Sequence, residues 1–307
     1  MIDKKFIDYL AGKSGIKDKS LIEKDFILQS LLIGFSKDKY FVENFAFKGG
    51  TCLVKCYAGY FRFSEDLDFT YINQGIFEGK NEKEIRRFLS SEISKLIGIV
   101  AYVSKIHGLD FKAEKVNKRY IEFGGSNKFL TLKIWFVSSV NKREQFIKIQ
   151  INFVELFDYK FKKLAAKPLI TKFDIKELKF LFPEYSDVLL MKPRLIVYDI
   201  KEILLEKVRA ILMRREVKAK DFIDVFVITK ILGKEVKSFK IKIISKIQFM
   251  LRYEKYKQNL EEKINIKTWI KPGEEQQLLL KSQDGFQIYL KKLQPFLKDI
   301  LSEFSKK

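Results

Sequence analysis

The sequence has few of the residues that build several common kinds of functional site. Its 307 residues include one histidine, His107, and two cysteines, Cys52 and Cys56. A single histidine excludes zinc sites made of histidine clusters. A Ser–His–Asp triad would need a nucleophile elbow, and the segment around His107 has none. Two cysteines four residues apart suit one helix face better than a disulfide framework, so we interpret them as packing residues of a protein in a reducing cytoplasm.

Long apolar runs are also absent. No stretch of 18 apolar residues is uninterrupted, so we expect no membrane span. The opening segment "MIDKKFIDYLAGKSG" mixes acids and lysines with its apolar residues, which is not typical of a signal peptide. We therefore expect no membrane partner.

Acidic residues are outnumbered, which leaves a formal charge of +21. Such a charge favours an anionic partner such as nucleic acid. Only ten of the 60 basic residues are arginine, however, and a surplus of Lys, Ile and Phe is also what an AT-rich genome produces. Both explanations stay open. With 47% apolar residues, the chain is long enough for one large or two ordinary domains.

The first half alternates between helical and extended patterns. Ser20 and Glu23 have capping-box spacing ahead of a helical apolar pattern. A short helix is predicted over 51–60, a strand from Phe63 onward, and a polar helix over about 81–97.

The second half begins extended and becomes helical. Period-two segments within 119–155 predict an antiparallel extension of the sheet. From residue 199 the pattern is helical, with helices expected over 200–215, 220–232, 236–257 and 283–307. We therefore predict an α/β (α+β) protein with a mixed β-sheet domain over 1–170 and a mainly helical domain over 171–307.

One stretch, "FKGGTCLVKCYAGYFRFSEDLDF", combines features that point to nucleotide chemistry. Gly49 and Gly50 let the backbone approach a phosphate at the start of a helix, where Thr51 adds a hydroxyl and a possible cap. Asp66 and Asp68 project to the same face of a strand. Paired carboxylates repel each other unless a cation lies between them, and oxygen ligands select a hard ion such as Mg²⁺.

Simpler interpretations exist for each part. A glycine pair is often only a turn, as we expect at Gly124 and Gly125, and an acidic pair is often a solvated strand edge. Leu67 and Phe69 indicate that this strand is packed on its other face, which favours a functional reason for the acids. The segment "GKNEKE" at Gly79 lacks phosphate-loop spacing.

The sequence resembles the AbiEii/AbiGii nucleotidyltransferase toxins of the DNA polymerase beta-like nucleotidyltransferase superfamily. The resemblance is carried by "EKDFIL", "KGGTCL", "RFSEDLDF" and "EKVRAILMRREVKAKDFIDVF", in the expected order. It implies an NTP-dependent enzyme that uses Mg²⁺, an AbiEi-like antitoxin partner, a role in phage defence, and an RNA acceptor, the 3′ end of tRNA. It also implies catalytic roles for Asp66, Asp68, Lys207, Asp221 and Asp224, with Asp66 and Asp68 on the metal, and nucleotide binding by Lys48, Gly49, Gly50, Thr51, Arg62, Ser64 and Arg214.

The residue spacing of the last block agrees with this. Lys207 and Arg214 are seven residues apart, which predicts one helix face for them, and Asp221 and Asp224 are predicted to share a face of the next helix. One departure concerns the third carboxylate of polymerase beta-type enzymes. The matching strand "FIKIQINFVE" has Gln150, Asn152 and Glu155 there, which leaves the general base open. Two alternatives follow: a non-catalytic basic RNA-binding or regulatory protein that keeps the fold, and a nucleotidyltransferase that modifies proteins.

Overall fold

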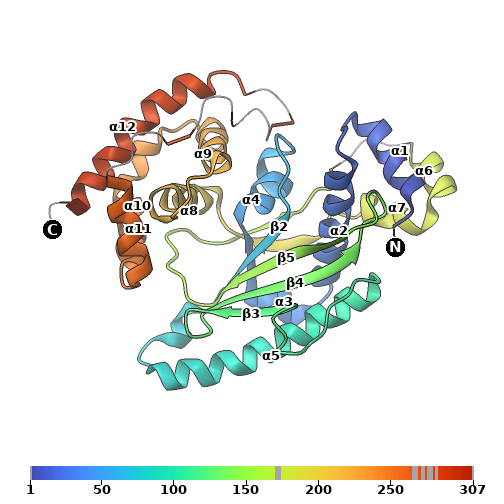
Figure 1. Cartoon of the computed structure of the whole chain (residues 1–307), viewed down its shortest axis with the longest axis horizontal. Helices are drawn as coiled ribbons and strands as arrows, with labels where there is room; N and C mark the ends of the chain where they lie inside the picture. Colours follow the sequence, from blue (N-terminus) through green and yellow to red (C-terminus); the bar gives the residue numbers. More distant parts are fainter. Residues whose placement is uncertain are drawn as a thin grey trace. The chain divides into compact units, whose positions relative to one another are not determined.

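The computed structural model describes residues 2–169, 174–264, 269–270, 274, 279–280 and 283–305 (Figure 1). The chain divides into two compact units. Unit 1 comprises residues 1–155 and 161–198, and unit 2 comprises residues 156–160 and 199–307. The domain division predicted between residues 170 and 171 falls outside the described residues.

Unit 1 contains a seven-stranded sheet in the order β3-β4-β5-β2-β1-β7-β6. Strand β4 is antiparallel to its neighbours β3 and β5, as predicted, but β5 pairs with β2 in parallel. The expected antiparallel extension is therefore wrong at this junction, because the chain between β2 and β5 includes a long helix that allows a parallel crossover. The strands are β1 (Phe45–Lys48), β2 (Asp66–Tyr71), β3 (Ile121–Gly124), β4 (Phe129–Val137), β5 (Glu144–Asn152), β6 (Lys162–Ala165) and β7 (Arg194–Val197).

The two faces of this sheet differ in chemistry because side chains alternate along each strand. One face carries fully buried apolar residues such as Leu67, Phe69, Ile149 and Ile151. The cartoon shows α3 and α5 along one side of the sheet (Figure 1). The opposite face, which we call the polar face, carries Asp66, Asp68, Thr70, Lys148, Gln150, Asn152, Thr131 and Lys133, together with Lys48.

The helices of unit 1 confirm the helical pattern but shift its ends. Helix α2 begins at Lys19 and is capped by Asp18, whose carboxylate accepts hydrogen bonds from the backbone of Ser20 and Leu21. The predicted cap at Ser20 is therefore wrong, because Asp18, an equally good capping residue, stands two positions earlier and the helix begins there. The helix that Asn81 caps extends to residue 106 and not to 97. The helices are α1 (Lys4–Ser14), α2 (Lys19–Ser36), α3 (Lys39–Asn44), α4 (Gly49–Cys52), the π-helix η1 (Leu53–Ala58), α5 (Glu82–Ile106), α6 (Ile175–Leu181) and α7 (Pro183–Leu190).

Unit 2 is helical in its described residues, as the pattern predicted. Its first helix ends at Met213, and Arg214 is already extended, so Arg214 does not continue the predicted helix. The predicted helix over 236–257 is divided, because turns interrupt it near residue 252. The helices are α8 (Ile200–Met213), α9 (Ala219–Leu232), α10 (Lys240–Met250), α11 (Glu254–Ile264) and α12 (Phe286–Ser305). Among the described residues, no helix is both long enough and apolar enough to cross a membrane.

Candidate active site

The two predicted metal-binding acids lie side by side on the polar face of unit 1. Asp66 and Asp68 occupy alternate positions of β2 and are half-buried, whereas Leu67 between them is fully buried. In the register of the sheet, Asp66 pairs with Lys148 of β5 and Asp68 pairs with Gln150. The Lys148 ammonium lies 3.4 Å from an Asp66 oxygen. The same-face geometry predicted from the sequence is therefore present.

The glycine pair that precedes the acids is explained by packing inside the protein. Gly49 has φ of +77°, and a Cβ there would lie 2.1 Å from a carboxylate oxygen of Asp68. A Cβ on Gly50 would lie 2.6 Å from a guanidinium nitrogen of Arg62 and 3.0 Å from the hydroxyl of Ser64. The glycines thus let the Asp68 carboxylate and the Arg62 guanidinium lie directly against the backbone, which fixes both groups at the start of α4.

Thr51 has a different role from the cap that the sequence predicted. It lies within α4 and is buried, and the capping position belongs to Lys48, which makes no side-chain cap. The Thr51 hydroxyl is 2.8 Å from the Ser64 hydroxyl and 2.5 Å from the carbonyl oxygen of Asp66. The cap prediction is therefore wrong. Thr51 instead ties the helix after the glycines to the beginning of β2.

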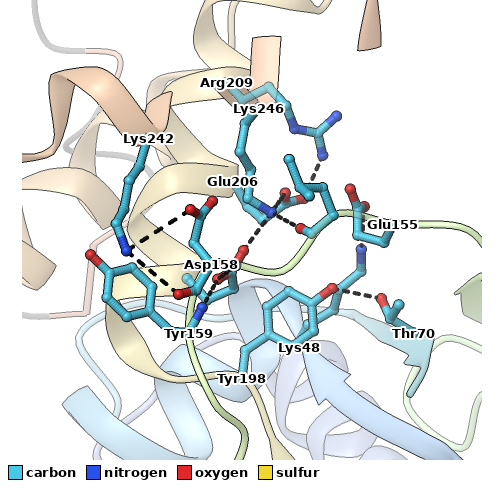
Figure 2. Close-up of polar contacts among 12 residues, drawn as sticks. Lys48, Thr70, Glu155, Asp158, Tyr159, Tyr198, Glu206, Arg209, Lys242 and Lys246 are labelled. Atoms are coloured by element: carbon cyan, nitrogen blue, oxygen red, sulfur yellow. Dashed lines mark hydrogen bonds and ion pairs between the residues drawn. The ribbon is translucent and has the colours of Figure 1, made fainter. Parts of the chain in front are cut away.

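The region where a third carboxylate was expected contains Glu155, which is engaged by a lysine. Glu155 is buried, and its carboxylate lies 3.6 Å from the Lys48 ammonium (Figure 2). It also accepts a hydrogen bond from Asn152. Thr70 of the polar face accepts a hydrogen bond from Tyr198 in the same view. Within the part of the chain that the structure describes, no three His, Cys, Asp or Glu side chains are grouped closely enough to hold a metal ion.

A pair of carboxylates nevertheless fits the coordination habit of Mg²⁺. This ion is commonly held by one or two protein carboxylates, and substrate phosphates and water complete its octahedron. Asp66 and Asp68 supply hard oxygen donors, and the packing of Asp68 against Gly49 restrains one of them. The donor set of β2 is therefore suited to a hard divalent cation that arrives with a phosphate ligand.

Replacing Gly49 with alanine is expected to lower both stability and nucleotidyl transfer. The new Cβ would displace the Asp68 carboxylate, and the left-handed backbone adds a conformational cost of about 1–3 kcal/mol. Gly125→Ala is a matched control, because Gly125 also has positive φ but its nearest neighbour would be 3.9 Å from the new Cβ. Thermal melting and a transfer assay on both variants check this. A Gly49→Ala protein that transfers nucleotide as well as Gly125→Ala would contradict it.

A buried polar cluster that the sequence analysis missed supports this region. Lys55 of η1 is buried, and its ammonium lies 2.9 Å from Asp25 and 2.6 Å from the Tyr60 hydroxyl. Burial, followed by the charge of Asp25, raises the pKa of Tyr60 well above its usual value. Gln29 of α2 joins the cluster through Lys55. The motifs "EKDFIL" and "KGGTCLVK" thus lie next to each other in the fold. Lys55, a charged residue within an otherwise apolar segment, was the only sign of this cluster in the sequence.

Unit 2 holds the other predicted residues in a second cluster. Lys207 of α8 lies 2.8 Å from Asp221 and 2.7 Å from Asp224, and Arg214 lies 2.6 Å from Asp221. Both aspartates are buried on α9 and contact the same lysine, so the predicted shared helix face is confirmed. Burial alone would raise the pKa of Asp221, but the charges of Lys207 and Arg214 outweigh it and hold the pKa below its usual value.

A further ion cluster in unit 2 fastens the short segment 156–160. Lys246 of α10 is buried, pairs with Glu202 and Glu206 of α8, and donates a hydrogen bond to the Leu156 carbonyl (Figure 2). Glu202 also accepts hydrogen bonds from the backbone N–H groups of residues 158 and 159. Burial raises the pKa of Glu202 although Lys246 opposes the shift. The segment that follows Glu155 is therefore firmly anchored within unit 2.

The structure thus brings the predicted residues together in two groups, one in each unit. The group of unit 1 surrounds α4 and β2, and the group of unit 2 lies on α8 and α9 with the residue after α8. Lys148 of β5 belongs to the first group and was missed, although it stands two positions before Gln150 in the same alternating pattern. The predicted residues of the first group are Lys48, Gly49, Gly50, Thr51, Arg62, Ser64, Asp66 and Asp68, and those of the second are Lys207, Arg214, Asp221 and Asp224.

Comparisons with known proteins identify the family. Two solved structures from Helicobacter pylori are similar at 15% identity and a TM-score of 0.45: JHP933, with 94% of this chain and 95% of that chain covered, and a candidate nucleotidyltransferase, with 94% and 99% covered. No curated protein matches the chain. The family model described as "Nucleotidyl transferase AbiEii toxin, Type IV TA system" matches residues 31–306. The chain therefore belongs to the AbiEii family of nucleotidyltransferase toxins.

Proposed function

We propose that this nucleotidyltransferase uses Mg²⁺ to transfer a nucleotidyl group from an NTP to the 3′ end of an RNA, with tRNA as the acceptor. The observation that carries the proposal is the pair of carboxylates on one face of β2, with Asp68 packed against the Gly49 backbone. When bound, Mg²⁺ supplies Lewis acidity that offsets the negative charge of the reacting phosphates. Asp66 and Asp68 would hold it.

The other residues of unit 1 would orient the nucleotide. Arg62 places a guanidinium beside Gly50, and Lys148 places an ammonium beside Asp66, so positive charge flanks the acids. Gln150 pairs with Asp68 in the sheet, where an amide can orient a hydroxyl but cannot accept its proton. In this proposal the acceptor hydroxyl loses its proton to a group other than Gln150.

The charged side chains of unit 2 have a proposed role that their own ion pairs limit. The family resemblance implies that Lys207 contacts the triphosphate. Two carboxylates already neutralise this lysine in the structure, which favours a fixed and oriented charge over a mobile one. A fixed charge of this kind acts without reorganisation during the reaction. The segment 234–271 is rich in lysine, which favours RNA binding there, and it includes residues outside the described ones.

The family is the toxin of a type IV toxin–antitoxin system, which implies an antitoxin partner. We propose that an AbiEi-like protein fills this role, that the system acts in phage defence, and that the toxin works in the cytoplasm, where NTPs and tRNA are found. Co-expression with the product of the neighbouring gene should relieve growth arrest. Unrelieved arrest with every neighbouring gene would contradict this assignment of the partner.

One assay separates the proposed function from its alternatives. The purified protein is incubated with total RNA, Mg²⁺ and each labelled NTP in turn, with EDTA as a control. We expect label at RNA 3′ ends in the tRNA size range. Label that enters only protein would favour the protein-modifying alternative. RNA binding without any labelling under all four NTPs would favour the non-catalytic alternative.

A further inference from the structure

The polar face of unit 1 carries two aromatic rings next to the row of residues that contains Asp66. Trp135 of β4 and Phe146 of β5 are paired in the register of the sheet, and their ring centroids are 4.8 Å apart at 53°. Phe146 is 39% exposed, although its neighbours Ile147 and Ile149 on the other face are fully buried. An aromatic residue that faces solvent from the middle of a strand is not explained by the core.

A basic side chain lies over each of the two rings. The Arg119 guanidinium lies 4.1 Å from the centre of the Trp135 ring, and the Lys133 ammonium lies 5.8 Å from the centre of the Phe146 ring. Trp135 is held in place because its indole N–H donates to the Arg119 carbonyl. We call Trp135, Phe146, Arg119 and Lys133 the aromatic platform. It combines a preformed stacking surface with positive charges at its edge.

Both cations of the aromatic platform form ion pairs with acidic residues, and these ion pairs lie at the protein surface. Arg119 pairs with Glu144 through both guanidinium NH groups and lies 3.5 Å from Asp110, whereas Lys133 pairs with Glu122. The side chains of these pairs are about one fifth to one half exposed. At the surface, water and salt screen these pairs. A phosphate with two charge-bearing oxygens can therefore compete for these cations. The net charge of +21 adds a long-range attraction for a polyanion.

The platform is continuous with the candidate active site. Phe146 is two residues from Lys148 along β5, and Lys148 is the register partner of Asp66. Two residues of a strand span about 6–7 Å, so the platform is one row of side chains away from the acids. All of these residues belong to unit 1. A nucleic acid chain that ends at Asp66 would place a nearby base over Phe146.

We infer that the aromatic platform binds the unpaired bases of a single-stranded RNA and so presents its 3′ end to Asp66 and Asp68. Aromatic side chains on a sheet stack on any base that is free of a partner, and flanking cations bind the backbone. Paired bases cannot stack in this way, so the surface selects single-stranded ends. The inference rests on the proposed function in one respect, namely that RNA is the acceptor.

The test measures RNA binding in the absence of NTP and Mg²⁺, so it does not depend on catalysis. A short fluorescein-labelled single-stranded RNA is titrated with the protein and followed by fluorescence anisotropy. Phe146→Ala should raise the Kd by about 5- to 100-fold, as at other base-stacking aromatics. Phe146→Leu keeps apolar bulk without a π face and should lose a similar amount, whereas Phe146→Trp should bind as well as the wild type.

Two controls separate stacking from folding. Phe180→Ala removes an aromatic ring of α6 that is 85% exposed, and it should leave the Kd unchanged. Thermal melting of Phe146→Leu should match the wild type. A Phe146→Leu protein that binds single-stranded RNA as the wild type does would overturn the inference, as would a wild-type protein that prefers duplex RNA or binds neither.

The same variants show which of the two proposals fails. If no NTP labels RNA but the Phe146 variants still lose binding, the proposed function is wrong and the platform stands. If RNA is labelled equally by the wild type and Phe146→Leu, and both bind it equally, the platform is wrong and the proposed function stands.

Discussion

Replacing Asp68 with asparagine is expected to lower the rate of nucleotidyl transfer by about 10³-fold or more, because under the proposed function the site loses a charge that would hold Mg²⁺ beside the reacting phosphates. The substitution preserves the shape of the side chain, so its packing against Gly49 is retained. Asp66→Asn should have a similar effect. A transfer assay with each labelled NTP measures the rate, and thermal melting shows whether the fold is kept.

Asp8→Asn is the matched control for these variants. Asp8 is a surface acid of unit 1 that pairs with Lys19, far along the chain from β2, and its loss should leave the rate unchanged. A second readout is the rise in melting temperature that Mg²⁺ and NTP produce together, which follows from binding to the native state alone. That rise should disappear in Asp68→Asn. Wild-type rates in either β2 variant would remove these acids from the site.

Replacing Lys207 with methionine is expected to destabilise unit 2 by about 3–5 kcal/mol, because two buried carboxylates lose the cation that neutralises them. The family resemblance adds an expected loss of about 10²- to 10³-fold in transfer rate, measured at a temperature where the variant stays folded. Lys218→Met, at an exposed lysine of the same unit, is the control and should change neither quantity. Urea unfolding measures the free energy.

The same variant predicts a change in acid stability. The folded-state pKa of Asp221 lies below its usual value, so this carboxylate stabilises the protein above that usual value, near 3.8. The contribution is lost as the pH falls through the lower, folded pKa. Without Lys207, Arg214 and the weaker charge of Lys220 remain to depress the pKa, so the loss of stability on acidification should become smaller. Equal acid dependence in wild type and Lys207→Met would show that Lys207 does not set this pKa.

The parts of the fold that the sequence predicted are those governed by local patterns. The alternation that places Asp66 and Asp68 on one face of β2 needs only neighbouring residues, and so does the helical spacing of Asp221 and Asp224. The four-residue strands β1 and β7 were not predicted, because such short apolar segments are ambiguous until they are paired. The parallel pairing of β2 with β5 depends on the whole intervening chain and has no local signal.

The candidate site divides in the same way. The motifs predicted which residues belong to the site. They did not predict the packing of Asp68 against Gly49 or the ion pairs of Lys207, because only the folded chain brings these positions together. Thr51 was misjudged as a cap because a threonine after two glycines suits a helix start, whereas its hydroxyl binds the Asp66 carbonyl. The catalytic roles of these residues remain predictions for the assays above.

The pairing of β2 with β5 also bears on how soon a newly made chain can act. Strands β2 and β5 are separated by more than 70 residues of the chain. The closure of a long loop must therefore precede their pairing, which slows folding. At about 5–20 residues per second, a ribosome needs roughly 4–16 s after completing β2 to finish β5. During this interval the acids of β2 have no partner strand on that side. A host cell is therefore exposed to the complete site of unit 1 only after half of the toxin has been synthesised, and truncated chains that end before residue 144 lack it.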